Sequence, residues 1–334
     1  MAEEIALQKT DGRFHELDSL RGIAALSVVF LHFRLMWTTS QTHKPRWLVL
    51  INPFTVGSEA VLFFFLLSGF VLALPLIRGK QQSYPIFLMR RIFRIYMPYL
   101  GAFGLALVGA AIWHKPLGTS EWADSTWSHP VTLRTVIEQM TLIGNYNWAQ
   151  YNTAFWSLVM EMRISIIFPA LYWVTRALGA RGGLAAAVTC SGGAALAIWR
   201  WPSAEQTVIT IQYASIFMWG ILFAIHLEAI NACYQKLTRG MKRVLAISSM
   251  LLFTWGHHIA RMVNDENFSL DQTLIVFGAM GYMLLSLNSR RLSNILTGTI
   301  PRFLGRISYS LYLVHATVLF AIFHLLGHRL PMLE

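Results

Sequence analysis

Long apolar runs alternate with short polar segments along almost the whole 334-residue chain. A helix needs about 20 predominantly apolar residues to cross a bilayer. The runs of roughly that length predict spans at 19–38, 57–77, 95–113, 154–174, 183–199, 207–227, 243–260, 272–288 and 308–328. The pattern therefore predicts an all-α fold, a polytopic transmembrane helix bundle with 9–10 spanning helices. Residues 1–334 form one integral-membrane domain in this interpretation, with 1–16 as a polar cytoplasmic N-terminal tail.

Whether the chain has nine or ten spans depends on the interpretation of segment 131–148. It is amphipathic and more polar than the other runs, so it fits an interfacial or re-entrant helix, or a tenth span. With nine spans and a cytoplasmic N-terminus, most of the 27 lysines and arginines fall on the cytoplasmic side, as the positive-inside rule requires. A tenth span at 131–148 would invert every later segment, so the charge pattern favours nine.

The composition agrees with a membrane protein. Hydrophobic residues make up 55% of the chain and charged residues 13%, whereas soluble domains carry about 25% charged residues. The net charge is +11, but the basic residues are spread over short loops, which excludes a nucleic-acid-binding patch. Cys190 and Cys233 form neither a disulfide framework nor a metal motif. His257-His258 is a weak pair, so no metal site is predicted.

Two ionisable residues of the first predicted span, Arg21 and His32, are functional candidates. Eleven residues advance a helix by about three turns and roughly 16 Å, so both side chains lie on nearly the same face. Arg21 fits either a cavity wall or a positive anchor that reaches the cytoplasmic surface. An ionisable group at the depth of His32 is rare and marks a functional candidate, although a histidine can also simply bond a neighbouring helix.

The fourth predicted span carries Glu161 and Arg163 within FWSLVMEMRISIIFP, residues 155–169. Burying an unpaired carboxylate is costly, so Glu161 should be paired or protonated. Glu161 and His32 both fall in the outer half of the bilayer, which favours a contact in which the carboxylate supports the imidazole. Arg163 points to a different helix face, where an intramembrane ion pair or another partner would hold it.

The third predicted span is preceded by the basic segment MRRIFRIYMPYL, residues 89–100. Arg91 and Arg94 are three residues apart and share a helix face. Guanidinium groups suit phosphates, but the same residues also fit positive anchors at lipid headgroups. Pro98 interrupts the helical hydrogen-bond ladder, which favours a shaped pocket at this point.

Other segments add small, polar and aromatic residues. Ser68-Gly69 in mid-span predicts close helix packing. The last span places four polar residues in its inner half: Ser308, Tyr309, Tyr312 and His315. His315 either lines a cofactor tunnel or is a satisfied core histidine. The outer loop 114–153 is rich in Trp, His, Asn and Tyr, which fit interfacial anchors or a surface that stacks on carbohydrate.

Together these motifs resemble the membrane acyltransferase-3 family over nearly the whole chain. The resemblance rests on Arg21 and His32 with ten residues between them, and on FFFLLSGF, RIFRIYMP, FWSLVME and ISYSLYLVH, all in the family's order. Any one motif is weak evidence, but the ordered set is specific. Members of the family usually have ten core spans, one more than the nine that the charge pattern favours.

The resemblance implies an integral-membrane O-acyltransferase of the bacterial inner (plasma) membrane. Such an enzyme moves an acyl group, commonly acetyl from cytoplasmic acetyl-CoA, to a hydroxyl of a cell-surface or exported glycan or a similar acceptor. The implied catalytic residues are His32, Glu161 and Arg21. The implied acyl-CoA-binding residues are Arg91, Arg94, Tyr309 and His315. The implied substrate-binding residues are Trp156 and Ser157.

The sequence leaves alternatives for mechanism and class. His32 acts either as a general base on the acceptor hydroxyl or as a nucleophile that forms a transient acyl-histidine. A polytopic transporter or flippase of a glycan or lipid-linked precursor would also carry His, Glu and Arg in its spans, and a structural subunit would not need His32. The expected partners are acyl-CoA, a hydroxyl acceptor and the bilayer, without nucleic acid; the sequence does not indicate the oligomeric state.

Overall fold

The structure is a computed structural model that describes residues 13–36, 54–80, 82–118, 120–262 and 270–326. Most of the predicted tail (1–12) and the ends of the first and last predicted spans (37–38, 327–328) lie outside these residues. The described chain is helical apart from turns and loops, which confirms the all-α prediction. The helices are α2 (His15–Met36), α4 (Gly57–Ile77), α5 (Tyr84–Ile112), α6 (Glu121–Asp124), α7 (Leu133–Thr141), α8 (Phe155–Ala177), α9 (Gly179–Arg200), a 3₁₀ turn (Pro202–Ala204), α10 (Glu205–Ile225), α11 (Leu227–Lys236), α12 (Arg239–Met262), α13 (Leu270–Asn288), α14 (Arg290–Leu296) and α15 (Thr299–Leu326).

Within the described residues, eight helices are long and apolar enough to cross a membrane: α2, α4, α5, α8, α9, α10, α13 and α15. They correspond to eight of the predicted spans and make the chain an integral membrane protein. The remaining prediction, 243–260, falls within α12, whose hydropathy is lowered by serines, a threonine and two adjacent histidines. Segment 131–148 contributes only α7 and turns, and the nine residues of α7 are too few to span a bilayer.

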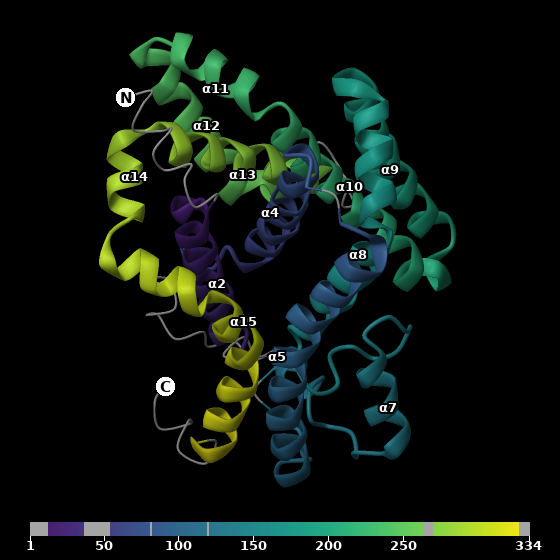
Figure 1. Cartoon of the computed structure of the whole chain (residues 1–334). Helices are drawn as coiled ribbons and strands as arrows, with labels where there is room; N and C mark the ends of the chain where they lie inside the picture. Colours follow the sequence, from purple (N-terminus) through teal and green to yellow (C-terminus); the bar gives the residue numbers. More distant parts are fainter. Residues whose placement is uncertain (1–12, 37–53, 81, 119, 263–269, 327–334) are drawn as a thin grey trace.

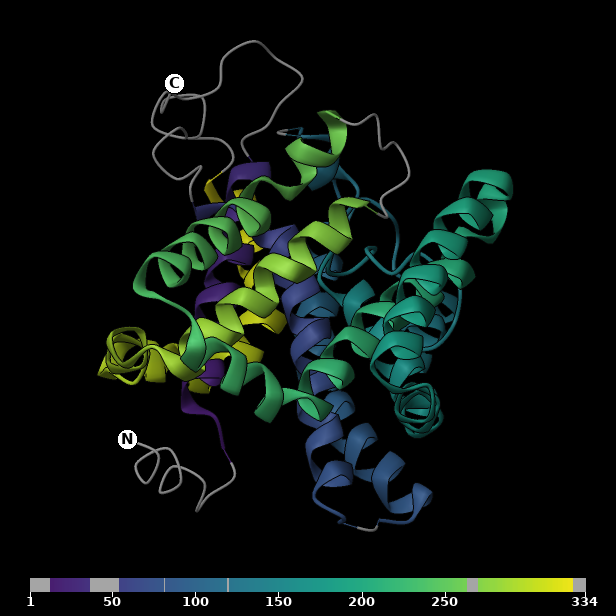
Figure 2. The same cartoon turned by 90° about the horizontal axis from the view of Figure 1, so that it is seen from above.

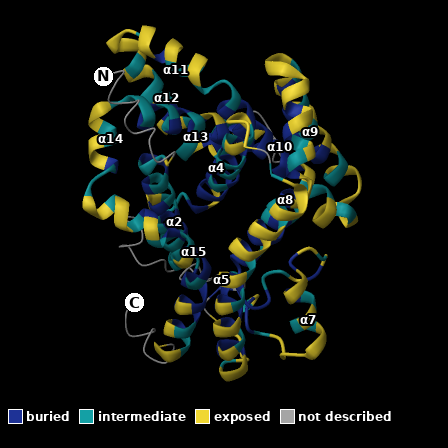
Figure 3. Ribbon diagram, in the orientation of Figure 1, coloured by how far each residue is buried: buried dark blue, intermediate teal, exposed yellow. Residues whose placement is uncertain are grey.

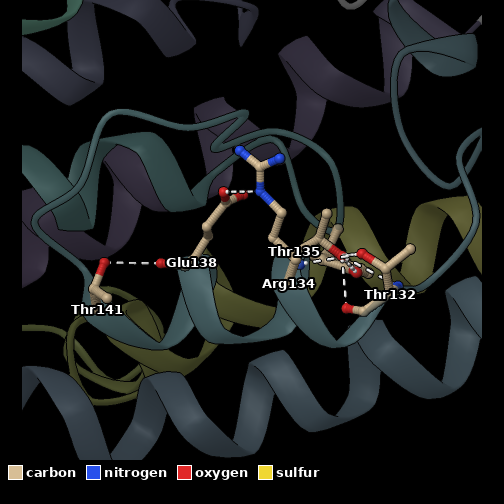
Figure 4. A network of polar contacts seen from close by, with 6 residues as sticks. Thr132, Arg134, Thr135, Glu138 and Thr141 are labelled. Atoms are coloured by element: carbon tan, nitrogen blue, oxygen red, sulfur yellow. Dashed lines mark hydrogen bonds and ion pairs between the residues drawn. The ribbon is translucent and has the colours of Figure 1, made fainter.

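The short helix α7 is stabilised by its own polar side chains, as Figure 4 shows. Thr132 at the N-cap and Thr135 form a reciprocal capping box, in which each hydroxyl accepts from the other residue's backbone N–H. Arg134 and Glu138, one turn apart, form an ion pair at 2.9 Å. The Thr141 hydroxyl donates to the carbonyl of Glu138. These local bonds allow a largely exposed, polar segment to fold as a helix.

Two pairs of helices cross so closely that glycine is required at the contact. α2 and α15 meet at Gly22 and Gly305, where a Cβ on either residue would strike the backbone of the opposite helix. α4 and α10 meet in the same way at Gly69 and Gly220. Small residues let helix backbones approach closely in a membrane. The packing predicted for the Ser68-Gly69 segment is therefore confirmed.

The helices divide into a buried centre and a more exposed periphery. Figure 1 shows α5 next to both α15 and α8, with α9 at the right and α11 and α12 at the top. Figure 2, seen from above, shows α12 and α13 side by side in green and yellow-green. Figure 3 shows extensive exposed surface on α9, α11 and α14, whereas α4 and α10 are largely buried. The polar residues that the sequence singled out lie mostly on the central helices.

A polar cluster joins α4, α12 and α13. Nδ1 of His257 lies 2.6 Å from Oδ2 of Asp271, and Nε2 of His257 lies 3.5 Å from Oε1 of Glu59. Both carboxylate side chains are buried, at 9% exposure, while His257 is 26% exposed. One imidazole therefore separates two buried carboxylates that would otherwise repel each other.

We expect His257→Ala to lower the melting temperature of the detergent-solubilised protein by about 5–10 °C. The substitution leaves Glu59 and Asp271 buried without the imidazole between them, and unpairing a buried charge costs about 3–5 kcal/mol. Thermal unfolding followed by circular dichroism checks the prediction. His258→Ala is the matched control, because this neighbouring imidazole is exposed. Equal melting temperatures for the two variants would contradict the role of His257 between the carboxylates.

Candidate active site

His32, on α2, contacts aromatic rings from α6 and α15. Its ring centroid lies 4.9 Å from that of Trp122 and 4.9 Å from that of His315. Nδ1 of His32 lies 2.6 Å from Nε2 of His315, which is a hydrogen bond between the two imidazoles. His315 is buried, whereas His32 is partly exposed. The two histidines therefore form a pair in which only the first is open to solvent or substrate.

The hydrogen bonds indicate which ring nitrogens carry protons. Nδ1 of His315 lies 2.7 Å from the backbone carbonyl oxygen of Tyr312, which can only accept, so this Nδ1 carries a proton. In a neutral His315 the other nitrogen, Nε2, is then an acceptor, and His32 donates to it through Nδ1. This assignment follows from the network and leaves the lone pair of His32 on Nε2. His315 thus orients His32 as a carboxylate orients the imidazole in hydrolase triads.

Glu161 has a different partner from the one predicted. Its Oε1 accepts a hydrogen bond from Nη2 of Arg91 at 2.5 Å, and Nε of Arg91 donates to Ser165 Oγ at 3.2 Å. The predicted contact between Glu161 and His32 is not formed, because His315 takes that place. Depth alone put the two side chains at one level. A buried carboxylate pairs best with a guanidinium fork, and α5 supplies this fork through Arg91.

Pro98 does not end the helix that carries Arg91 and Arg94. α5 runs without a break from Tyr84 to Ile112, so the helix begins eleven residues before the predicted span at 95–113. The proline lies inside it and removes one backbone donor from the ladder. Both arginines therefore project from a continuous helix, and the pocket predicted at this point is formed by neighbouring helices instead of by a helix break.

A central cavity of about 80 Å³ is bounded by residues of α2, α4, α5, α8 and α15. The predicted site residues that line it are Arg21, Arg91, Arg94, Ser157, Glu161 and Tyr309. Most of the remaining lining is apolar and comes from α4. The cavity therefore combines guanidinium groups with an apolar wall. Among the described residues, no group of three or more His, Cys, Asp or Glu side chains is placed to hold a metal ion.

Tyr312 connects the central cavity to the histidine pair. Its side chain lines the cavity and its hydroxyl lies 2.6 Å from Oγ of Ser157, while its backbone carbonyl binds His315. Tyr309, one turn before, also lines the cavity and donates to the carbonyl of Ile95 at 3.3 Å. Of the two interpretations of His315, the structure shows a buried histidine whose second nitrogen is used to hold His32.

Trp156, like the two histidines, is a predicted site residue that does not line the central cavity. Its ring packs against Phe65 and Tyr213, with centroid separations of 6.2 Å and 5.4 Å. The adjacent Ser157 faces the cavity instead. Consecutive residues of a helix point in directions about 100° apart, so the two members of this predicted pair occupy different environments.

Two residues next to the histidine pair were not singled out from the sequence. Trp122 supplies the ring stacked on His32. The side-chain amide of Asn152 donates to the carbonyl of Leu313 at 3.0 Å and to the hydroxyl of Thr317 at 3.1 Å, which fixes the start of α8 against α15. Trp122 belongs to the aromatic-rich loop 114–153, and that composition is the sequence signal that could have found it. Asn152 carried no comparable signal.

Arg163 fastens the loop between α7 and α8 to α10. Its guanidinium donates to neutral acceptors: the carbonyl oxygens of Ile143, Gly144 and Gln206, Oδ1 of Asn145 and Oγ1 of Thr210. The ion pair that was one interpretation of Arg163 is thus replaced by bonds to neutral groups. In the same loop, burial raises the pKa of the Tyr146 phenol to about 12, so this hydroxyl stays protonated at neutral pH.

The eight apolar helices, the arginine-lined cavity between them and the histidine pair define a polytopic membrane protein with a polar site inside the bundle. The chain belongs to the membrane acyltransferase-3 family: the family's sequence model, described as an acyltransferase domain, matches residues 14–333. The protein is therefore a membrane acyltransferase, which confirms the resemblance and sets aside the transporter alternative.

Two relatives are similar over most of the chain. The acyltransferase MdmB of Streptomyces mycarofaciens is 28% identical over 338 residues, which cover 95% of this chain and 81% of MdmB. The O-acetyltransferase PaAT-1 of Phomopsis amygdali is 26% identical over 385 residues, which cover 94% of this chain and 73% of PaAT-1. No solved structure shows a significant match. The likeness to these enzymes thus extends across the whole helix bundle.

Proposed function

We propose that the protein transfers an acyl group, most simply acetyl, from acyl-CoA to a hydroxyl of a glycan or similar acceptor. The donor enters the central cavity from the end of the bundle that carries Arg21, and the acceptor reaches His32 from the other end. The two residues are about 16 Å apart along α2. We place the protein in the bacterial inner (plasma) membrane with its N-terminus in the cytoplasm, because this orientation puts most of its basic residues inside.

The observation that carries the proposal is the hydrogen-bonded series from the Tyr312 carbonyl through His315 to His32. A hydroxyl attacks a thioester efficiently only if its proton is removed as the new bond forms. The series fixes the ring of His32 and leaves Nε2 as the proton acceptor. A histidine whose only role was packing would not require a second buried imidazole in this tautomer.

The proposed reaction follows from that geometry. The hydroxyl oxygen attacks the carbonyl carbon of the thioester while its proton passes to Nε2 of His32. The carbon–sulfur bond then breaks, and the imidazolium of His32 returns the proton to the departing CoA thiolate. The products are an ester and the free thiol of CoA. His315 stabilises the imidazolium in between, because its Nε2 keeps accepting the Nδ1 proton of His32.

The donor cavity offers complementary surfaces for the two parts of an acyl-CoA. The apolar wall from α4, which includes Phe64 and Val71, suits the thioester arm. Arg21 and Arg94 supply guanidinium groups for the phosphates. Arg91 was predicted to share this role, but its guanidinium binds Glu161. We therefore assign Arg91 and Glu161 to the wall that shapes the cavity, with Tyr309 beside them.

The names of the relatives support the chemistry of the acceptor. PaAT-1 is an O-acetyltransferase and MdmB an acyltransferase, which favours a hydroxyl acceptor and an acetyl donor for this chain. Trp122 stacks on both His32 and Phe320, and we place a sugar ring of the acceptor beside this group of aromatic rings. Ser157 completes the polar lining between the cavity and the histidine pair.

Purified protein in liposomes, supplied with radiolabelled acetyl-CoA and a panel of glycans, tests the proposed function. We expect release of the CoA thiol that depends on the acceptor, with the label recovered in an ester that mild alkali cleaves. Absence of acceptor-dependent CoA release from folded, membrane-inserted protein would overturn the proposal. A carbohydrate whose ester content depends on the protein in cells would identify the acceptor.

A further inference from the structure

A second cavity, the basic pocket, lies between the start of α2 and the turn from α14 to α15. Figure 1 shows these three helices next to one another. The pocket has a volume of about 380 Å³, within the range of small-molecule sites. Its charged and hydroxyl-bearing lining includes Arg13, Asp18, Ser19, Thr299, Arg302 and Arg306. These residues have no part in the roles assigned to the central cavity.

Positive charge is in excess in the basic pocket. Arg302 and Arg306 are four residues apart and therefore project from one face of α15, and both line the pocket. Arg13 lines it from the α2 side and binds the carboxylate of Asp18 at 2.5 Å. Within the described ranges, the ion pairs do not engage Arg302 or Arg306. One carboxylate thus faces three guanidinium groups, which favours an anionic ligand.

Ser19 gives a second and independent indication of a ligand. It is fully buried, at 0% exposure, and it lines the basic pocket. Its hydroxyl has no hydrogen-bond partner among the described residues. Buried hydroxyl groups are nearly always hydrogen-bonded. A buried, unpartnered hydroxyl in a pocket that Arg302 and Arg306 also line indicates a ligand with several acceptor oxygens.

The basic pocket is related to the central cavity through a third cavity, which shares lining residues with each of them. This cavity of about 380 Å³, the connecting pocket, shares Arg13 and Asp18 with the basic pocket. It shares Arg21 and Arg94 with the central cavity. Arginines therefore mark a path that begins at the surface of the bundle and ends beside the apolar wall of α4. An elongated ligand with phosphates at one end and an apolar arm at the other matches this order.

We propose that the basic pocket binds the 3′-phosphate of the acyl-CoA donor, an inference that rests on the proposed function. Arg302 and Arg306 hold this phosphate monoester, while Arg21 and Arg94 hold the diphosphate nearer the cavity. A phosphate monoester carries a charge of about −2 and three acceptor oxygens, which match two guanidinium forks and the Ser19 hydroxyl. The headgroup of an anionic lipid offers the same phosphate chemistry, and the experiment separates the two sources.

The test compares acetyl-CoA with 3′-dephospho-acetyl-CoA as donors for the protein in nanodiscs of neutral phosphatidylcholine. We expect the wild-type KM to be about tenfold higher for the dephospho donor, the effect of a charge-assisted hydrogen bond. In the double variant Arg302→Gln/Arg306→Gln, the KM for acetyl-CoA rises by at least the same factor while that for the dephospho donor does not change. The matched control is Arg290→Gln/Arg291→Gln, two exposed arginines of α14 that do not line the pocket; it should alter neither KM.

Equal KM values for the two donors in the wild-type protein would overturn the proposal, and so would an equal rise for both donors in the pocket variant. The two KM values of the wild-type protein test the proposal even if the double variant does not fold. If neither donor supports transfer, the proposed function fails, and calorimetric binding of CoA and 3′-dephospho-CoA decides on the pocket separately. A preference for CoA that the double variant loses supports the site, and equal affinities overturn it. Binding of phosphatidylglycerol through Arg302 and Arg306 without discrimination between donors would assign the pocket to lipid headgroups and overturn it too.

Discussion

Replacing His32 with alanine is expected to lower the rate of acyl transfer by about 10²- to 10⁴-fold, the contribution of a positioned general base. The loss falls on kcat, because the imidazole acts on the proton that moves in the transition state. The KM for acetyl-CoA should change little, since His32 does not line the donor cavity. Steady-state kinetics of the purified variant with saturating acceptor measure both quantities.

His258→Ala controls for loss of an imidazole elsewhere in the bundle, because this histidine is exposed on α12. His315→Gln tests the relay, since it removes the imidazole that orients His32, and should shift the pH–rate profile as well as lower kcat. Near-wild-type turnover of His32→Ala would show that His32 is not the general base. If the wild-type enzyme is quenched in mid-reaction, an acylated peptide containing His32 would show that the residue acts as a nucleophile instead.

Arg91→Ala and Glu161→Ala should each destabilise the protein by about 3–5 kcal/mol and abolish acyl transfer. Either change leaves a charge inside the bundle without its partner; in the Arg91–Glu161 pair, held at 2.5 Å, 7% of the arginine side chain and 22% of the glutamate side chain are exposed. In the double variant Arg91→Met/Glu161→Leu no buried charge is left unpaired, so stability should largely return. Transfer should not return, because the polar wall of the central cavity is lost.

Unfolding in mixed micelles and kinetics on the same preparations separate these two effects. Arg90→Ala is the matched control, because Arg90 is the adjacent arginine and is exposed. If the double variant regained both stability and near-wild-type turnover, the pair would be purely structural. If Arg91→Ala kept its stability and only raised the KM for acetyl-CoA, Arg91 would bind phosphate directly, as the sequence predicted, and would not serve as the partner of Glu161 in the cavity wall.

The pattern of apolar and polar residues predicted the features that depend on one helix alone. The spacing of Arg21 and His32 put them on one face of α2, and the small residues of FFFLLSGF predicted the close approach of α4 to another helix. The length of the apolar runs located the eight spans. α12 is long enough to span a bilayer but too polar, and α7 is too short. These properties are local, so one sequence is sufficient to predict them.

The partners of buried polar residues were harder to predict, because they depend on which helices are neighbours. Depth placed Glu161 level with His32, yet α8 presents this carboxylate to Arg91 of α5. Arg163 bonds a loop of irregular backbone, whose free carbonyls no hydrophobic pattern reveals. The pairing of His32 with His315 joins the first and last of the described helices, 283 residues apart in the sequence. Helix adjacency of this kind is encoded in packing, which apolar periodicity does not resolve.

The close backbone contact at Gly22 and Gly305 fixes the position of α2 relative to α15. α2 carries Arg21 and His32, and α15 carries Arg306 and His315, so the proposed phosphate-binding residues and the proposed base lie on two helices that are packed tightly against each other. The distance from Arg21 to His32 is then set by the rise of the helix, about 16 Å along α2, and not by the closure of a loop. A donor whose arm is shorter or longer than this distance would place its thioester carbon away from His32.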